Sequence, residues 1–166
     1  RLSNDQDYLK KCLDKGSFCY LHAPLFHPAM KNVASVRREL KFKTFFNVLG
    51  PLVNPSQPKN QLCGVYNLEI ARLYGYVFEN TNKNYSILHS LDGYDEISLT
   101  NDFKLLSRNK SAINSPDYFG FNKINPKELE GGIEIKDSVD IFMKILENKA
   151  TKNQTNVVLA NSAIAI

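Results

Sequence analysis

The sequence lacks the features that mark several large classes of protein. It contains 21 Lys and Arg against 17 Asp and Glu residues, a net charge of +4, but no block of five or more like charges. Proteins that bind nucleic acid gather their basic residues into a patch or stripe, so we expect no nucleic-acid partner. A small anionic ligand accounts for the surplus charge equally well. No apolar run approaches the length of a membrane-spanning helix, and we expect no membrane association.

Cysteine is scarce, and its spacing excludes two further classes. Cys12, Cys19 and Cys63 make neither an even disulfide set nor a Cys-x-x-Cys motif. No secretory signal peptide opens the chain. We therefore expect reduced thiols and a cytoplasmic protein.

The apolar pattern predicts an α/β fold. Helical spacing covers residues 3–15 (capped by Ser3), 28–40, 44–49, 68–80 and 135–148, and short apolar runs at 18–21, 61–66 and 85–89 are typical of buried strands. Residues 103–106 and 111–113 form a predicted hairpin. This order predicts a mixed, largely parallel central sheet flanked by helices, with a β-hairpin insertion. The predicted helix 135–148 carries its apolar residues on one face: Ile135, Val139, Phe142, Ile145 and Leu146.

The two ends of the chain suggest a piece of a longer protein. It begins at Arg1, not at a methionine, and it stops at Ile166 within an apolar run that has no capping residue. The interpretation is that residues 1–166 are a single fragment of one α/β domain.

Arg37 is the first candidate for a binding residue. In the predicted helix 28–40, Ala29, Val33 and Leu40 belong to the core stripe, and Arg37 lies roughly 70° from the centre of that stripe. A guanidinium at the edge of an interior can hold a carboxylate or a phosphate in bidentate fashion. The alternative is a structural ion pair with a nearby Asp or Glu. His27, just before the helix, is equally open to a structural role as a loop cap.

The Gly50-Pro51 pair interrupts a very apolar stretch. Glycine and proline together break the helix and expose backbone. Another segment of the chain or a ligand could approach closely there. A purely structural turn is the alternative.

Asp95 and Glu96 are the candidate metal ligands. They follow the strand at 85–89 and the turn signal Asp92-Gly93. In a loop at the end of a strand, both carboxylates can turn toward one ligand site. Magnesium takes one or two protein carboxylates and shares phosphate oxygens of its substrate. Many acidic pairs, however, are simply solvated surface.

Four segments together resemble a known family. They are HPAMKNVASVRREL (27–40), TFFNVLGPLVNP (44–55), QLCGVY (61–66) and DGYDEIS (92–98). In this order and spacing they are similar to the signature of the anthranilate phosphoribosyltransferases. The resemblance covers the chain from about Ser3 to its last residue.

The resemblance implies transfer of a 5-phosphoribosyl group from phosphoribosyl pyrophosphate to the amine of anthranilate. This is the second step of tryptophan biosynthesis, and the family's enzymes are typically magnesium-dependent homodimers. By resemblance, Arg37 holds the anthranilate carboxylate, His27 and Gly50-Pro51 lie along the anthranilate path, and Asp95 and Glu96 bind Mg²⁺ beside the diphosphate. No catalytic acid, base or nucleophile is implied, because the aromatic amine needs positioning more than activation.

The resemblance also implies missing parts. The family's N-terminal helical domain, which carries the dimer surface, and its glycine-rich diphosphate loop precede the first residue of this chain. We therefore expect the isolated fragment to be inactive.

Two other functions stay open at this point. A pyrimidine nucleoside phosphorylase would share the fold but use a nucleoside and inorganic phosphate. A non-catalytic domain would bind an anion or a protein partner through Arg37 and its neighbours.

Overall fold

The computed structural model describes residues 2–27 and 47–166. The chain divides into two compact units, Arg1–Gln57 and Pro58–Ile166. The predicted helix over residues 28–40 lies outside the described residues. The first part of the predicted helix over 44–49, residues 44–46, also lies outside them.

The first unit contains α1 (Gln6–Gly16) and α2 (Ala23–Phe26). The carboxylate of Asp5 accepts a hydrogen bond from the Tyr8 N–H at 3.0 Å and caps α1. The predicted cap at Ser3 is wrong. Its hydroxyl accepts from the Asp5 N–H at 3.1 Å, one step before the helix, because Asp5 is the residue whose side chain reaches the free N–H groups of the first turn.

The predicted buried strand at residues 18–21 is also wrong. These residues have no strand structure, and Phe18 and Tyr20 are 70% and 59% exposed. A four-residue apolar run becomes a strand only where another strand pairs with it. None of the described strands does so.

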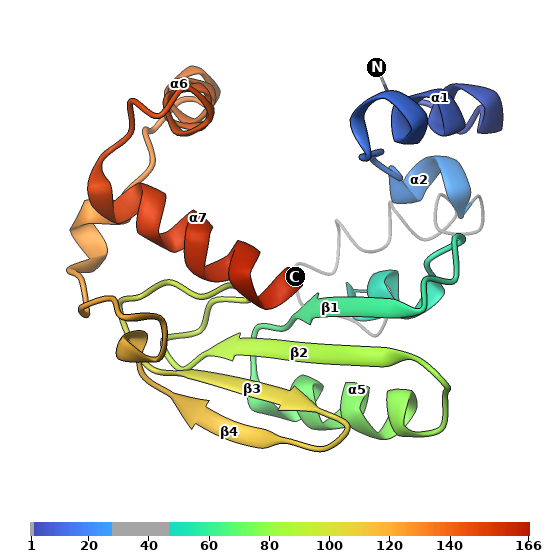
Figure 1. Ribbon diagram of the computed structural model, residues 1–166, viewed down its shortest axis with the longest axis horizontal. Helices are drawn as coiled ribbons and strands as arrows, with labels where there is room; N and C mark the ends of the chain where they lie inside the picture. The colour runs from blue at the N-terminus through green and yellow to red at the C-terminus, as the bar shows by residue number, and fades with distance from the viewer. Residues whose placement is uncertain (1, 28–46) are drawn as a thin grey trace, which may run out of the picture. The chain divides into compact units, whose positions relative to one another are not determined.

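The second unit is built on a four-stranded mixed sheet in the order β1-β2-β3-β4 (Figure 1). The strands are β1 (Asn60–Gly64), β2 (Asn84–Ser90), β3 (Phe103–Ser107) and β4 (Ser111–Asn114). The first pairing is parallel, and the other two are antiparallel. The mixed sheet and the hairpin of β3 and β4 are thus confirmed. The described strands are not largely parallel, because two of their three pairings are antiparallel. The strand expected at 61–66 ends at Gly64, although the Val65 N–H still donates to the Leu88 carbonyl at 2.9 Å.

Helix α5 (Leu68–Glu79) links β1 to β2 and covers one face of the sheet. Asn67 caps it by accepting the Ile70 N–H at 2.8 Å. Tyr74 and Phe78 are buried in this layer together with Cys63 of β1. Burial raises the pKa of the Cys63 thiol to about 11 and that of the Tyr74 hydroxyl to about 12. Both groups therefore stay protonated at neutral pH.

A second apolar cluster involves α7 (Lys152–Ala165). Ala160 of α7 is fully buried in a cluster with Leu88 of β2 and Phe103 of β3. Leu88 and Leu105 face each other across the β2–β3 ladder, and Leu105 packs on the same cluster. Ile97, in the loop between β2 and β3, is also fully buried there. The last helix is thereby fixed over the loop that carries the two candidate metal ligands.

Helix α6 (Ile135–Leu146) forms as predicted, and its apolar face is exposed. Ile135, Phe142 and Leu146 are 85%, 59% and 62% exposed. A helical period identifies an apolar face without identifying what packs on it. None of the described residues buries this face.

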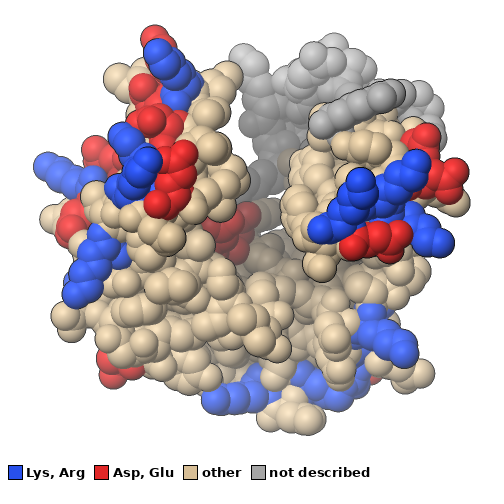
Figure 2. All heavy atoms as spheres, turned by 45° about the horizontal axis from the view of Figure 1, so that its top comes forward, with Lys and Arg blue, Asp and Glu red and all other residues tan. Residues whose placement is uncertain are grey.

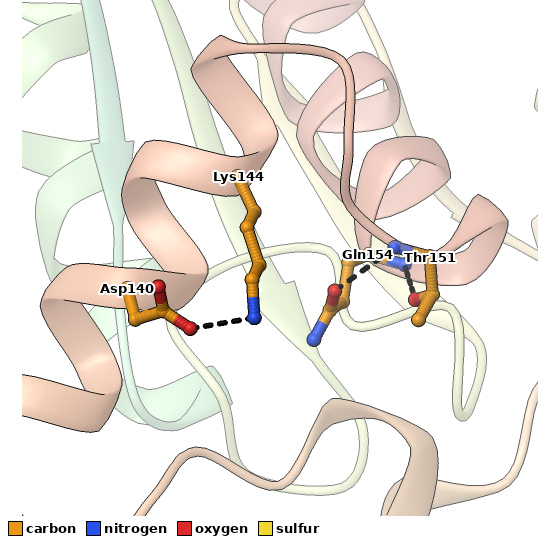
Figure 3. Close-up of polar contacts among 4 residues, drawn as sticks. All are labelled: Asp140, Lys144, Thr151 and Gln154. Carbon is orange, nitrogen blue, oxygen red and sulfur yellow. Dashed lines mark hydrogen bonds and ion pairs between the residues drawn. The ribbon is translucent and has the colours of Figure 1, made fainter.

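Figure 3 shows one local polar contact in α6 and one at the start of α7. Lys144 and Asp140 form an exposed ion pair of 2.6 Å, one turn apart in α6. In α7, Thr151 and Gln154 form a capping box, in which each side chain accepts the backbone N–H of the other at 3.2 Å. The box satisfies two N–H groups at the start of α7.

The charged surface has no single basic stripe on the face drawn in Figure 2. Lys and Arg side chains occur there in several separate groups, some of them beside Asp and Glu. Among residues 2–27 and 47–166, no helix has the length and hydropathy needed to cross a bilayer.

Candidate active site at the ends of β1 and β2

A tight turn starts the loop that carries Asp95 and Glu96. The Gly93 N–H donates to the Ser90 carbonyl, and the Ser90 N–H donates to the Tyr94 carbonyl, both at 2.9 Å. Gly93 has a φ of +100°, a backbone conformation that residues other than glycine rarely adopt. The turn signal at Asp92-Gly93 is confirmed. The chain therefore reverses directly after β2, and the two acids lie at the carboxyl end of that strand.

The carboxylate of Asp92 organises the rest of the loop. It accepts hydrogen bonds from the hydroxyls of Ser98, at 3.2 Å, and of Thr100. The Thr100 hydroxyl also lies 2.7 Å from the Ser98 hydroxyl. Between them, Leu99 is fully buried with φ of +60°, an uncommon conformation for leucine. The hydroxyl contacts and the burial of Leu99 hold this strained conformation in place.

The backbone at Asp95 and Glu96 is held from three other elements. Gly64, the last residue of β1, leaves room for the Asp95 carbonyl, which would lie 1.9 Å from a Cβ at that position. The Ser90 hydroxyl, from the end of β2, donates to the Glu96 carbonyl at 2.7 Å. The side chain of Asn161, in α7, bonds both the N–H and the carbonyl of Ile97, at 2.8 and 2.9 Å.

The side chains of Asp95 and Glu96 themselves are exposed. Both line two hollows of about 440 and 460 Å³, and Val157 of α7 lies in the walls of both. No hydrogen bond or ion pair joins either carboxylate to another described residue. The loop thus presents two free carboxylates from a backbone that is fixed.

A metal bound here would need ligands beyond this pair. Within residues 2–27 and 47–166, no group of three or more His, Cys, Asp or Glu side chains could enclose an ion. Two carboxylates and open space are what Mg²⁺ uses when a substrate phosphate and water complete its shell. The described donor set therefore fits Mg²⁺ shared with a substrate better than a closed structural metal site.

Comparison with known proteins identifies the family. The model of the glycosyl transferase family, a/b domain, matches residues 1–166, the whole chain. The chain belongs to this glycosyl transferase family.

Two relatives are anthranilate phosphoribosyltransferases. An anthranilate phosphoribosyltransferase of Flavobacterium psychrophilum is 55% identical over all 166 residues, and one of Bacteroides fragilis is 46% identical over the same length. Each match covers the whole of this chain and 50% of the relative. The chain thus spans about half the length of the curated relatives it matches.

Solved structures of the family have the same fold. Anthranilate phosphoribosyltransferase from Saccharomyces cerevisiae, in complex with PRPP and Mg, matches with a TM-score of 0.83 and 25% identity, over 95% of this chain and 46% of that one. The enzyme from Thermus thermophilus matches with a TM-score of 0.80 and 26% identity, over 90% and 45%. These matches confirm the α/β fold expected from the sequence.

The candidate anthranilate-binding residues of this glycosyl transferase chain lie in its first unit or outside the described residues. His27 is half-buried at the end of α2, where its backbone N–H donates to the Ala23 carbonyl at 2.9 Å. Gly50 and Pro51 begin a short 3-10 helix, Gly50–Val53. Arg37 lies outside the described residues, so its role stays a prediction.

The supporting residues Gly64, Ser90 and Asn161 were missed by the sequence reasoning. Gly64 lies in the GVY motif and carries a signal, because a glycine that ends a strand often marks a close backbone approach. Ser90 and Asn161 carry none. Serine after a strand and asparagine in a helix are common in any α/β protein.

Proposed function

We propose that the chain is the catalytic α/β part of an anthranilate phosphoribosyltransferase. This enzyme transfers a 5-phosphoribosyl group from phosphoribosyl pyrophosphate to the amine of anthranilate and releases pyrophosphate, the second step of tryptophan biosynthesis. The observation that carries the proposal is the 55% identity, over every residue of the chain, to a protein of that name. The exposed carboxylates of Asp95 and Glu96 at a strand end support it.

Asp95 and Glu96 are the proposed magnesium ligands. Their carboxylates are exposed, free of other described partners and next to open volume, as a shared metal site requires. Mg²⁺ bound there would neutralise the negative charge that grows on the departing pyrophosphate. The fixed backbone around Ile97 would hold both carboxylates where the diphosphate binds.

The proposed anthranilate site consists of Arg37, His27, Gly50 and Pro51. A guanidinium at position 37 suits bidentate capture of the anthranilate carboxylate. The turn at Gly50–Val53 would let backbone approach the flat ring closely. The aromatic amine is a nucleophile without deprotonation, so these residues would act by orienting it toward the ribose carbon. No general base is required.

The remaining proposals concern the whole protein. We place this chain within one catalytic α/β domain of a longer cytoplasmic homodimer, whose dimer surface lies in a helical domain outside these residues. The half-length match to the relatives supports this proposal. The 166-residue chain alone is then expected to form no phosphoribosyl-anthranilate.

The test uses the full-length protein that carries this chain. With phosphoribosyl pyrophosphate and Mg²⁺, loss of anthranilate fluorescence measures turnover. The Asp95→Ala/Glu96→Ala double variant should lose turnover and fail to support growth without tryptophan. Glu69→Ala, an exposed carboxylate in the first turn of α5, should behave as wild type.

The alternative functions give different results in the same test. Phosphorolysis of a pyrimidine nucleoside without anthranilate turnover would identify a nucleoside phosphorylase. Growth without tryptophan by the double variant would remove the metal assignment and favour a non-catalytic domain. Arg37→Ala should abolish quenching of anthranilate fluorescence on binding, and unchanged quenching would contradict the role of Arg37.

A further inference from the structure

The amide of Asn161 makes an unusual contact for a helix side chain. Its Oδ1 accepts the Ile97 N–H at 2.8 Å, and its Nδ2 donates to the Ile97 carbonyl at 2.9 Å. The same Nδ2 donates to the Val157 carbonyl, one turn earlier in α7, also at 2.9 Å. Only one orientation of the amide satisfies all three bonds. After a flip, Oδ1 would face the two carbonyl oxygens and Nδ2 would face the Ile97 N–H.

The peptide groups that Asn161 holds belong directly to the acidic loop. Ile97 follows Glu96 in the chain, and its side chain is fully buried beside Ala160, the residue before Asn161. On the other side, the Ser90 hydroxyl holds the Glu96 carbonyl at 2.7 Å. The backbone after Glu96 is therefore fixed by side chains from α7 and β2.

The carboxylates, in contrast, have no such support. The side chains of Asp95 and Glu96 are exposed and have no partner among the described residues. Asn161 lies with both acids in the wall of the hollow of about 460 Å³. Their direction thus depends on the backbone, and the backbone at Ile97 depends on Asn161.

We propose that Asn161 is a positioning residue that sets the magnesium affinity of the Asp95–Glu96 pair through its two hydrogen bonds to Ile97. The inference rests on the proposed function. It assigns to α7 a part in metal binding, although no residue of α7 is a proposed metal ligand.

The test compares three variants of the full-length protein: Asn161→Ala, Asn161→Asp and Asn156→Ala. Asn156 is on the same helix, five residues away and on a different face, so Asn156→Ala makes the same chemical change without affecting Ile97. For each variant, turnover is measured against Mg²⁺ concentration and separately against anthranilate. Asn161→Asp keeps an acceptor for the Ile97 N–H and loses the donor to its carbonyl.

The two Asn161 variants should need about tenfold more Mg²⁺ for half-maximal activity, as expected from the loss of one or two hydrogen bonds. The KM for anthranilate should change by less than about twofold, and saturating Mg²⁺ should restore kcat. A general loss of folded protein would instead lower kcat at every Mg²⁺ concentration. Asn156→Ala should match wild type.

Unchanged Mg²⁺ dependence in Asn161→Asp would overturn the proposal. If Asn161→Ala does not fold, as judged by circular dichroism, Asn161→Asp alone decides. The double variant Asp95→Ala/Glu96→Ala separates the two proposals. If it loses turnover while the Asn161 variants keep wild-type Mg²⁺ dependence, the metal site stands and the positioning role fails. If it keeps wild-type Mg²⁺ dependence, the metal site itself is wrong.

Discussion

Replacing Gly64 with alanine tests the close approach between β1 and the acidic loop. The new Cβ would lie 1.9 Å from the Asp95 carbonyl oxygen and 2.9 Å from its carbon. Ordinary contact begins at 3.4 Å, so the Asp95 carbonyl has to retreat by about 1.5 Å. The hydrogen bonds at Ile97, of 2.8 and 2.9 Å, tolerate much less than this before they break.

Two effects should follow in the full-length protein. Overpacking should lower the free energy of unfolding by about 1–3 kcal/mol, measured by urea denaturation. A shift of roughly 1 Å in positioned groups costs about a hundredfold in rate, so turnover at low Mg²⁺ should fall by roughly that factor. The Mg²⁺ concentration needed for half-maximal activity should rise in the same variant.

Gly75→Ala in α5 is the matched control. Its new Cβ would meet only the flexible end of Leu106, at 3.1 Å, and alanine favours a helix over glycine by up to about 1 kcal/mol. This variant should keep wild-type Mg²⁺ dependence. If Gly64→Ala has the wild-type free energy of unfolding and the wild-type Mg²⁺ dependence, the close approach of the Asp95 carbonyl to Gly64 is contradicted.

Three further predictions concern stability and reactivity. Burial raises the pKa of the Cys63 thiol from 9.0 to about 11. The stability that this thiol contributes is therefore complete below pH 9 and is lost as the pH rises through 11, so urea titrations should show a smaller loss of stability at alkaline pH in Cys63→Ala. An aromatic disulfide reagent at pH 8 should modify Cys12 before Cys63. The Arg108 guanidinium donates to four carbonyls, two in the last turn of α5 and two just after it, and the shortest bond is 2.6 Å. Arg108→Ala should therefore lower the free energy of unfolding by about 1–2 kcal/mol. Arg108→Lys should recover only part of this loss. Thr151→Ala should cost about 1 kcal/mol by removing the cap of α7, while equal stability of this variant and the exposed neighbour control Lys152→Ala would contradict the capping role.

The sequence predicted the elements whose formation is decided locally. Helix α5 and strands β2, β3 and β4 form where expected, because their apolar periods and flanking turn residues lie within a few residues of each other. The predicted strand at 18–21 was wrong, because a strand depends on a partner strand that a short apolar run does not identify.

The candidate site divides in the same way. The position of Asp95 and Glu96 after a strand was predictable from the strand pattern and the Asp-Gly turn, while their role as metal ligands stays a prediction. Asn161 lies 64 residues beyond Ile97, and only the folded chain brings the two together. The role of Arg37 stays a prediction from the helical pattern and the resemblance.

The long separation between Ile97 and Asn161 has a consequence during synthesis. A ribosome adds about 5–20 residues per second, so several seconds pass between the appearance of the acidic loop and that of the side chain that holds it. During this interval, β1 to β4 can already pair, while the loop between β2 and β3 still lacks its anchor. The order of translation therefore delays the anchoring of the acidic loop until α7 has been synthesised.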